Sequence, residues 1–205
     1  MKHFGDIAFT DKVKAEQTRQ GSRDIYAGMT ARPAPSGFSD REAAFIAARD
    51  SFYMATVSEQ GWPYLQHRGG PAGFLKLLGP TTLGFADYSG NRQYVSVGNL
   101  QTDKRVSLFL MDYINRRRLK LLGHARVQDA SADPDLAARL SVDGEGKVER
   151  LFTIEIDAFD WNCPQYITPR FTEAELASVL GPTVDELQTL RQENAYLRKQ
   201  IADMA

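Results

Sequence analysis

In Leu151-Phe152-Thr153-Ile154-Glu155-Ile156-Asp157-Ala158-Phe159, apolar side chains at Phe152, Ile154 and Ile156 alternate with polar ones. Successive side chains of a β-strand point to opposite faces of a sheet, so this alternation predicts a strand with one buried face. The sequence therefore indicates that a β-sheet, half covered by a hydrophobic core, organises the main domain.

Working outward from this strand, similar runs rich in apolar and β-branched residues are separated by short turns such as Glu59-Gln60-Gly61 and Gly79-Pro80. Further strands are predicted at 52–57, 62–68, 74–78, 82–86, 105–112 and 119–128. Short helices are expected at 42–50, 91–98 and 134–141. Six or seven strands with short connections predict a mainly β (α+β) fold, an antiparallel barrel with peripheral helices.

The chain divides into three segments by composition. Residues 1–38 are polar and end in a Pro- and Gly-containing connector at 32–37, so we expect an N-terminal arm. The barrel is predicted at 39–170 and opens with a capping box in which Ser39 caps a helix and Glu42 reaches back to it. Residues 171–205 are expected to form C-terminal helices, with Gly181-Pro182 breaking the chain before a coiled-coil segment at 183–205.

A heptad repeat runs through 183–205. The a positions are Leu187, Asn194 and Ile201, and the d positions are Thr183, Leu190, Leu197 and Met204. Glu186 and Glu193 stand at g, and Arg191 and Arg198 stand at e, a pattern that gives ion pairs between two parallel helices. Three heptads are marginal alone in water, so we expect the coil within a homodimer. Two alternatives stay open: a helix packed on its own domain, and a coil that recruits a different protein.

Composition excludes several classes of function. The 205 residues include 25 Lys and Arg and 26 Asp and Glu, giving a net charge of −1, so neither nucleic acid nor a membrane surface is a predicted partner. The single cysteine, Cys163, excludes an intrachain disulfide and a multi-cysteine metal site. No apolar run approaches the roughly 18 residues of a membrane span, and we expect a cytoplasmic protein.

The stretch from 85 to 99 is the best candidate for chemistry. A predicted strand runs into a Ser-Gly-Asn turn, and we expect Asn91, Arg92 and Gln93 to open a short helix that carries Ser96 one turn later. Free amides at a helix start, beside an arginine, form a site for a phosphate monoester. The alternative is an ordinary turn and helix cap with a solvated arginine.

Two neighbouring features add to this candidate. Gly69 and Gly70 follow Arg68 at a predicted strand end, where glycines let a ligand approach the backbone closely. Three arginines follow at 116–118, and strand alternation places Arg118 and Lys120 on one face of the sheet. The alternative is that these arginines are solvated residues at the start of a strand.

Across 40–166 the sequence resembles the split barrels related to pyridoxamine 5′-phosphate oxidase, in their flavin-nucleotide-binding subgroup. The resemblance is carried by 74–76, 83–93, 105–108 and 121–126, which match in order and spacing, and by His67-Arg68-Gly69-Gly70-Pro71 and Trp161-Asn162-Cys163-Pro164-Gln165. It implies a six- to seven-stranded antiparallel split β-barrel and a homodimer that binds FMN at its subunit interface.

The resemblance also assigns residues to the cofactor. Lys76 matches a lysine that contacts the flavin nucleotide, Ala86 and Asp87 match a pair whose backbone approaches it, and Arg118 matches a glutamine that reaches the ring system. The phosphate clamp corresponds to Asn91, Arg92 and Gln93, with Gln93 replacing a lysine. Pro71 replaces an arginine of the family, for which Arg68 is a candidate substitute.

The C-terminal part departs from the true oxidase, whose Trp- and Arg-rich strand pair binds the substrate. Here Trp161 and Gln165 are candidates for contact with the flavin of the partner subunit, and the alternative for Trp161 is a core residue. We therefore expect an FMN-dependent oxidoreductase acting on an unidentified small molecule. The alternative is a non-catalytic or sensory module that binds a flavin, a deazaflavin or haem.

Overall fold

The computed structural model describes residues 1–143, 146–161 and 163–203, and they form two compact units. The first unit, here called the barrel unit, comprises Met1–Asp112 and Arg117–Gln165. The second, the helical unit, comprises Tyr113–Arg116 and the chain from Tyr166 onward. Each unit is described by itself.

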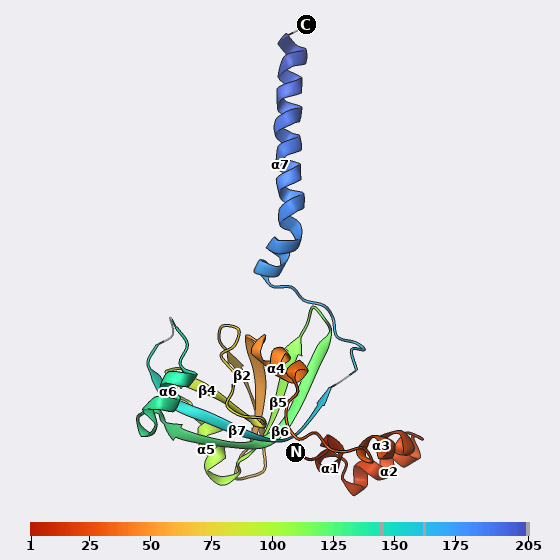
Figure 1. The fold of residues 1–205 in the computed structure, drawn as a ribbon, viewed down its shortest axis with the longest axis vertical. Helices are drawn as coiled ribbons and strands as arrows, with labels where there is room; N and C mark the ends of the chain where they lie inside the picture. The colour runs from red at the N-terminus through yellow and green to blue at the C-terminus, as the bar shows by residue number, and fades with distance from the viewer. Residues whose placement is uncertain (144–145, 162, 204–205) are drawn as a thin grey trace. The chain divides into compact units, whose positions relative to one another are not determined.

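All strands of the barrel unit belong to one antiparallel sheet in the order β2-β1-β5-β6-β7-β4-β3 (Figure 1). Their bounds are β1 Ser51–Val57, β2 Pro63–Gly69, β3 Lys76–Leu77, β4 Thr82–Tyr88, β5 Arg105–Asp112, β6 Arg117–Asp129 and β7 Val148–Trp161. The predicted strands are confirmed, and the alternating stretch forms the centre of β7.

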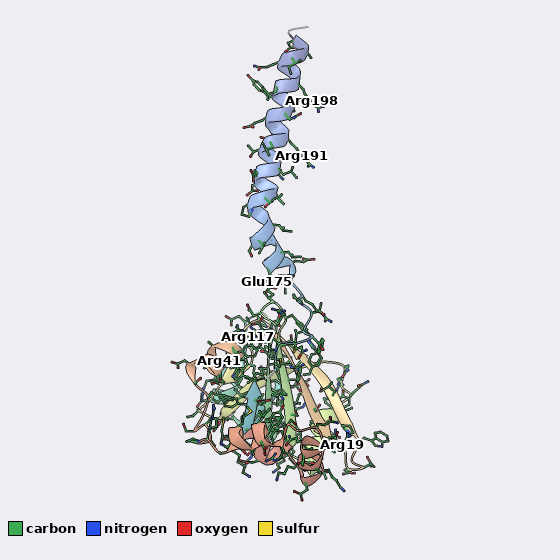
Figure 2. All side chains as sticks on the ribbon, turned by 90° about the vertical axis from the view of Figure 1, so that its right-hand side faces the viewer. Arg19, Arg41, Arg117, Glu175, Arg191 and Arg198 are labelled. Carbon is green, nitrogen blue, oxygen red and sulfur yellow. The ribbon has the colours of Figure 1, made fainter. Side chains whose placement is uncertain are left out.

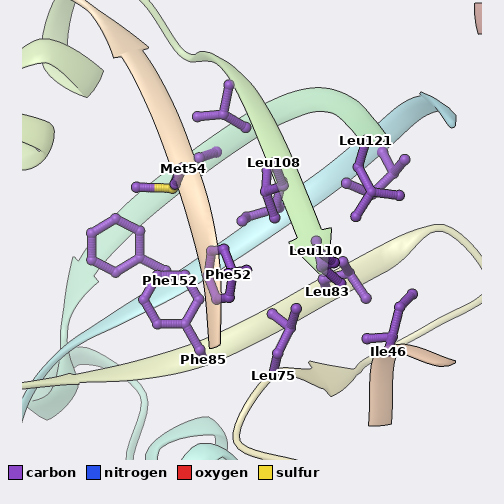
Figure 3. Packing of buried hydrophobic residues seen from close by; sticks show 14 of the residues in the cluster. Ile46, Phe52, Met54, Leu75, Leu83, Phe85, Leu108, Leu110, Leu121 and Phe152 are labelled. Atoms are coloured by element: carbon purple, nitrogen blue, oxygen red, sulfur yellow. The ribbon is translucent and has the colours of Figure 1, made fainter. Parts of the chain in front are cut away.

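The inner face of the sheet closes around a core of aromatic and aliphatic side chains (Figure 3). The ring of Phe52 on β1 lies 5.5 Å from that of Phe85 on β4, although these strands are not neighbours in the sheet. Phe85 in turn stacks on Phe152 of β7 with ring centroids 4.6 Å apart. Side chains, rather than a backbone ladder, thus join the two ends of the curled sheet, and the predicted split barrel is confirmed.

A β-bulge bends the longest strand pair, because the register between β6 and β7 shifts at Leu122/Gly123. A Cβ atom at Gly123 would lie 2.2 Å from the carbonyl oxygen of Glu155. Only glycine allows the two backbones to approach this closely, so the residue fixes the bend that helps the sheet to curl.

Helices lie around the barrel. The segment 1–38, expected as an arm, contains α1 (Phe4–Ala8), α2 (Asp11–Arg19) and α3 (Arg23–Thr30). Its two ends pack on the core through Met1 and Phe38. The remaining helices of this unit are α4 (Asp40–Ala47), α5 (Val95–Thr102), the 3₁₀ turn η1 (Ala130–Ala132) and α6 (Pro134–Leu140). The predicted capping box of Ser39 and Glu42 is present at α4.

The helical unit corrects one prediction, because Gly181-Pro182 does not break the chain. One helix, α7, runs from Glu173 to Asp203 with Pro182 inside it. A proline inside a helix removes one backbone hydrogen bond, crowds the carbonyl group four residues earlier and also clashes with the Cβ of the preceding residue. Gly181 has no Cβ, so the last of these clashes is absent at Pro182. The helix starts ten residues before the predicted coil, at a capping box in which Thr172 and Glu175 bond reciprocally.

Two glycine substitutions test the role of the bulge. Gly123→Ala should lower the free energy of unfolding by about 1–3 kcal/mol, because the new methyl group meets backbone. Gly98→Ala is the matched control: it lies in α5 with no atom within 4 Å of its would-be Cβ. It should raise stability by about 0.5–1 kcal/mol. Urea denaturation measures both, and equal effects would contradict the assignment of the bulge.

Candidate functional site

A cavity of about 240 Å³ opens between β2, β4 and the loop that leads into α5. Strand alternation turns Tyr64, Gln66 and Arg68 of β2 to the inner face, opposite the buried positions 56, 54 and 52 of β1. The inner face of β2 is therefore polar where that of β1 carries Phe52 and Met54, and these three side chains of β2 line the cavity.

An ion pair crosses the cavity wall. Arg68 on β2 donates from Nη1 to Oδ1 of Asp87 on β4 over 2.6 Å, and both side chains are about 15% exposed. The guanidinium of Arg68 also lies 5.0 Å from the ring centroid of Phe152. Its Nε is buried and has no hydrogen-bond partner within the described part of the chain. The arginine thus has one strong partner and one unused buried donor.

A second arginine, Arg150 on β7, reaches the same carboxylate. It pairs with Asp87 in the sheet register, and its Nε lies 3.9 Å from Oδ2 of Asp87. It also forms an ion pair with Glu149 and lies over the ring of Tyr94 at 4.4 Å. Sequence reasoning missed Arg150, because only the β4–β7 register, set by distant parts of the chain, places it there.

The loop before α5 differs from the prediction. We expected Asn91, Arg92 and Gln93 to open the helix, but α5 begins at Val95. Arg92 and Tyr94 have positive φ angles of 59° and 53°, and such left-handed residues cannot continue a right-handed helix. Asn91 accepts a hydrogen bond from the backbone N–H of Gln93, so it closes a local turn instead of capping α5.

This loop nevertheless brings the predicted clamp to the cavity, which Asn91, Arg92, Gln93 and Ser96 all line. Arg92 is exposed, and its Nε lies 3.4 Å from the hydroxyl oxygen of Tyr94. The guanidinium groups of Arg150 and Arg92 lower the pKa of the Tyr94 hydroxyl. Two guanidinium groups thus lie beside Tyr94, a residue that lines the cavity.

The floor of the cavity is held by hydrogen bonds from α5 to the barrel. The hydroxyl of Ser96, which is buried, donates to Oε1 of Gln66 over 2.8 Å. One turn later, the buried Asn99 donates from Nδ2 to the hydroxyl oxygen of Thr56. These bonds fix the first turn of α5 against β1 and β2, so the backbone amides at its start have a fixed position.

The comparisons with known proteins bear on this barrel directly. The family model described as pyridoxamine 5′-phosphate oxidase matches residues 38–155, more than half of the chain. The chain belongs to the pyridoxamine 5′-phosphate oxidase family. No curated protein sequence matches it.

Solved structures with a similar fold share little sequence with this family member. HupZ of Group A Streptococcus is 12% identical over 65% of this chain and 99% of its own, with a TM-score of 0.49. General Stress Protein 26 of Bacillus anthracis is 15% identical over 63% and 92%, with a TM-score of 0.45. An F420 reductase is 17% identical over 62% and 98%, with a TM-score of 0.42.

Other residues that the family resemblance singled out lie outside the main cavity. Gly69, Gly70 and Ala86 line a separate space of about 30 Å³, enough for a water molecule or two. Lys76 donates from Nζ to the carbonyl oxygens of Arg139 (2.8 Å) and Ser141 (3.1 Å), at the C-terminal end of α6. Its ammonium group therefore stabilises a helix end in this chain.

Arg118 and Gln165 are also apart from the cavity. The guanidinium of Arg118 lies 5.6 Å from the ring centroid of Phe109, and its buried Nε has no partner among the residues described. Gln165 is exposed at a turn. Within one chain of this oxidase-family protein, these two residues do not join the clamp around Arg92.

Trp161 packs within its own barrel unit. Its ring lies 4.7 Å from that of Phe45 on α4, and its Nε1 donates to Oε1 of Glu42 over 2.6 Å. Burial raises the pKa of Glu42, but hydrogen bonds from Ser39, Trp161 and the backbone outweigh this effect and lower the pKa below 4.5. The contacts in this chain are those of a core residue that anchors α4.

Two further properties hold for the part of the chain that the structure describes. No three His, Cys, Asp or Glu side chains gather there in a way that would bind a metal ion. None of its helices combines the length and apolar character needed to cross a membrane.

The ion pair at the cavity wall can be tested by mutation. Asp87→Ala should lower the free energy of unfolding by about 3–5 kcal/mol, because it leaves the partly buried Arg68 without its carboxylate and removes one of the two carboxylates beside Arg150. The double variant Arg68→Met/Asp87→Leu should lose less, since one unpaired charge is removed with its partner. Denaturant titration of both variants is the measurement, and a double variant less stable than Asp87→Ala would contradict this account.

Glu42 provides a pH-dependent test of the Trp161 anchor. Because its pKa is lowered in the folded protein, its stabilising effect is present above 4.5 and is lost as the pH falls through the folded-state pKa. Glu42→Gln should therefore be less stable than the wild type at pH 7, with the difference shrinking below pH ~4.5. Trp161→Phe, which keeps a ring but removes the donor, should show the same trend with a smaller amplitude.

Proposed function

We propose that this chain binds FMN and that the cavity beside Arg92 holds the phosphate of the cofactor. The observation that carries the proposal is the convergence of Arg92 and the start of α5 on one small cavity. Tyr94, which precedes α5, offers no side-chain cap, so the first amides of the helix have no acceptor from it. Such amides bind phosphate oxygens well, and an adjacent arginine adds charge-assisted hydrogen bonds.

The charges in the cavity suit an anion. Arg68 and Arg92 face a single lining carboxylate, Asp87, and Asn91, Gln93 and Ser96 add polar groups. The buried, unpartnered Nε of Arg68 is a donor that would gain from an acceptor oxygen. The residues present therefore fit the phosphate and sugar-alcohol part of a flavin nucleotide.

The size of the cavity supports a cofactor site that is shared between two copies of the chain. At about 240 Å³ it lies below the roughly 300–1,000 Å³ typical of sites that enclose a whole cofactor. We propose that a second copy of the chain covers the ring system, so that the protein acts as a homodimer with FMN at the interface. Trp161, Gln165, Arg118 and Lys76, which lie outside the cavity of one chain, remain candidates for contacts across that interface.

Bound FMN would supply hydride or electron transfer, with the protein providing binding, orientation and charge. In this proposal Arg92 and the α5 amides hold the phosphate, while Arg68 and the backbone at Gly69 and Gly70 lie toward the ring. We assign no catalytic acid or base, and the substrate is a small molecule of unspecified class.

One observation favours a second function, binding without turnover. The carboxylate of Asp87 neutralises Arg68 at 2.6 Å, which reduces the positive charge that would otherwise stabilise a reduced, anionic flavin. A carrier or sensory module for a flavin, a deazaflavin or haem would tolerate this arrangement. NAD(P)H oxidation by the FMN-loaded protein separates the two functions: turnover supports the oxidoreductase, and its absence despite tight binding supports the module.

Arg92→Ala tests the phosphate site. Loss of a charge-assisted contact should weaken FMN binding by roughly 1.5–3 kcal/mol, or about 10- to 150-fold in Kd. Quenching of FMN fluorescence during titration with the protein is the measurement. Arg19→Ala is the matched control, because Arg19 lies on α2 (Figure 2), is exposed and paired with Glu16, and does not line the cavity.

Two results would overturn the proposal. The first is a wild-type protein that neither copurifies with FMN nor quenches its fluorescence at micromolar concentrations. The second is equal affinity for FMN in Arg92→Ala and Arg19→Ala. Riboflavin, which lacks the phosphate, adds a chemical control, since Arg92→Ala should not change its affinity.

A further inference from the structure

The helix α7 contains a longer apolar seam than its last three heptads. Because the helix is continuous from Glu173 to Asp203, the heptad register that places Leu187 at a extends backward without interruption. It places Leu180 at a and Leu176 at d. Gly181 and Pro182 then fall at b and c, the positions that face water in a two-stranded coil. The residues that look like a helix break lie on the outside of the seam.

The seam side chains are exposed in the single chain. The apolar residues at a and d are between 42% and 68% exposed: Leu176, Leu180, Leu187, Leu190, Leu197 and Ile201. No residue of α7 is buried. Six large apolar residues in one register over about seven turns are typical of a helix that buries them against another helix.

The g and e positions, which flank the apolar seam, show which helix is the partner of α7. In a parallel pair, a residue at g faces the residue at e five positions later in the partner. Glu186 then faces Arg191, Glu193 faces Arg198, and further toward the N-terminus Val179 faces Val184. Arg191 and Arg198, one heptad apart, lie along the same side of the helix (Figure 2). The helix is therefore complementary to a second copy of itself.

The same pattern excludes an antiparallel pair of copies. In that arrangement g faces g and e faces e, so glutamates would oppose glutamates and arginines would oppose arginines. Asn194 at an a position adds a second constraint, because a buried asparagine is satisfied by the same asparagine of a parallel, in-register partner.

We infer that α7 pairs with α7 of a second copy in a parallel, in-register, two-stranded coiled coil from Leu176 to Ile201. The pairing covers the six apolar seam residues and forms up to four Glu–Arg ion pairs per dimer. It holds two barrel units at a high effective concentration whether or not a cofactor is present. This inference is independent of flavin binding.

Site-specific cross-linking of the full chain tests the register. In a Cys163→Ser background, Leu197→Cys places a thiol at d, and Lys199→Cys places one at f, on the outside of the coil. Mild oxidation should convert most of the Leu197→Cys protein, and little of the Lys199→Cys protein, to a disulfide-linked dimer. Dimerisation of the barrel alone has no reason to favour position 197 over position 199, two residues away on the same helix, so it cannot give this difference. Leu190→Cys, also at d, provides a second reporter.

A charge exchange tests the partner. Glu186→Lys/Glu193→Lys and Arg191→Glu/Arg198→Glu each create like-charge pairs with their own copies, and each should reduce cross-linking through Leu197→Cys by about tenfold or more. An equimolar mixture of the two variants restores opposite charges at every pair and should restore cross-linking. Far-UV circular dichroism confirms that the barrel units remain folded, since all four positions are exposed.

Several results would overturn the inference. Equal cross-linking at 197 and 199 would show random collision. Absence of cross-linking at both d positions would show that α7 does not pair with its own copy, and would leave a different protein as its partner. Failure of the mixed charge variants to recover would exclude the parallel register.

Discussion

The barrel depends on the contact that joins β2 to β4 where no backbone ladder does. These strands lie first and sixth in the seven-stranded order, and the Arg68–Asp87 ion pair holds them together. Phe52 of the adjacent β1 packs against Phe85 of β4 and supports the same closure. A sheet left open between β2 and β4 would expose its hydrophobic face. Side-chain contacts therefore close this barrel, as backbone hydrogen bonds close a continuous one. Closure by charge also costs desolvation, which Arg150 offsets by contacting the same carboxylate from β7.

The candidate site exists because the side chains at the junction between β2 and β4 are polar. Inner-face positions of β2 would be apolar in a sealed barrel, yet here they are Tyr64, Gln66 and Arg68, and the cavity forms where they meet the loop before α5. The arginine that closes the fold is therefore also a wall of the cavity. Stability and binding are coupled through one guanidinium, and a ligand that engages Arg68 would act on the closure of the barrel as well.

The sequence was informative wherever the structure depends on local pattern. The alternation in β7 and the apolar run of β5 predicted strands, and Ser39 with Glu42 predicted a helix start, because each signal lies within a few residues. It failed where backbone geometry or strand register decides. Left-handed residues moved the start of α5 to Val95, and only the β4–β7 pairing brings Arg150 to Asp87. Likewise, α7 continues through Pro182, which the local sequence marks as a break, and the missing Cβ at Gly181 removes one of the clashes that a proline makes there.

The two left-handed residues before α5 restrict how related sequences can diverge. A residue other than glycine in this conformation costs about 1–2 kcal/mol, and a branched Cβ raises that cost further. Valine, isoleucine or threonine at 94 would push the turn toward another shape and move Arg92 away from the cavity mouth, and the same residues at 92 would distort the turn as well as remove the arginine. Homologues that keep this loop are thus expected to draw on asparagine, aspartate, glycine or unbranched side chains at both places, whatever ligand they have come to bind.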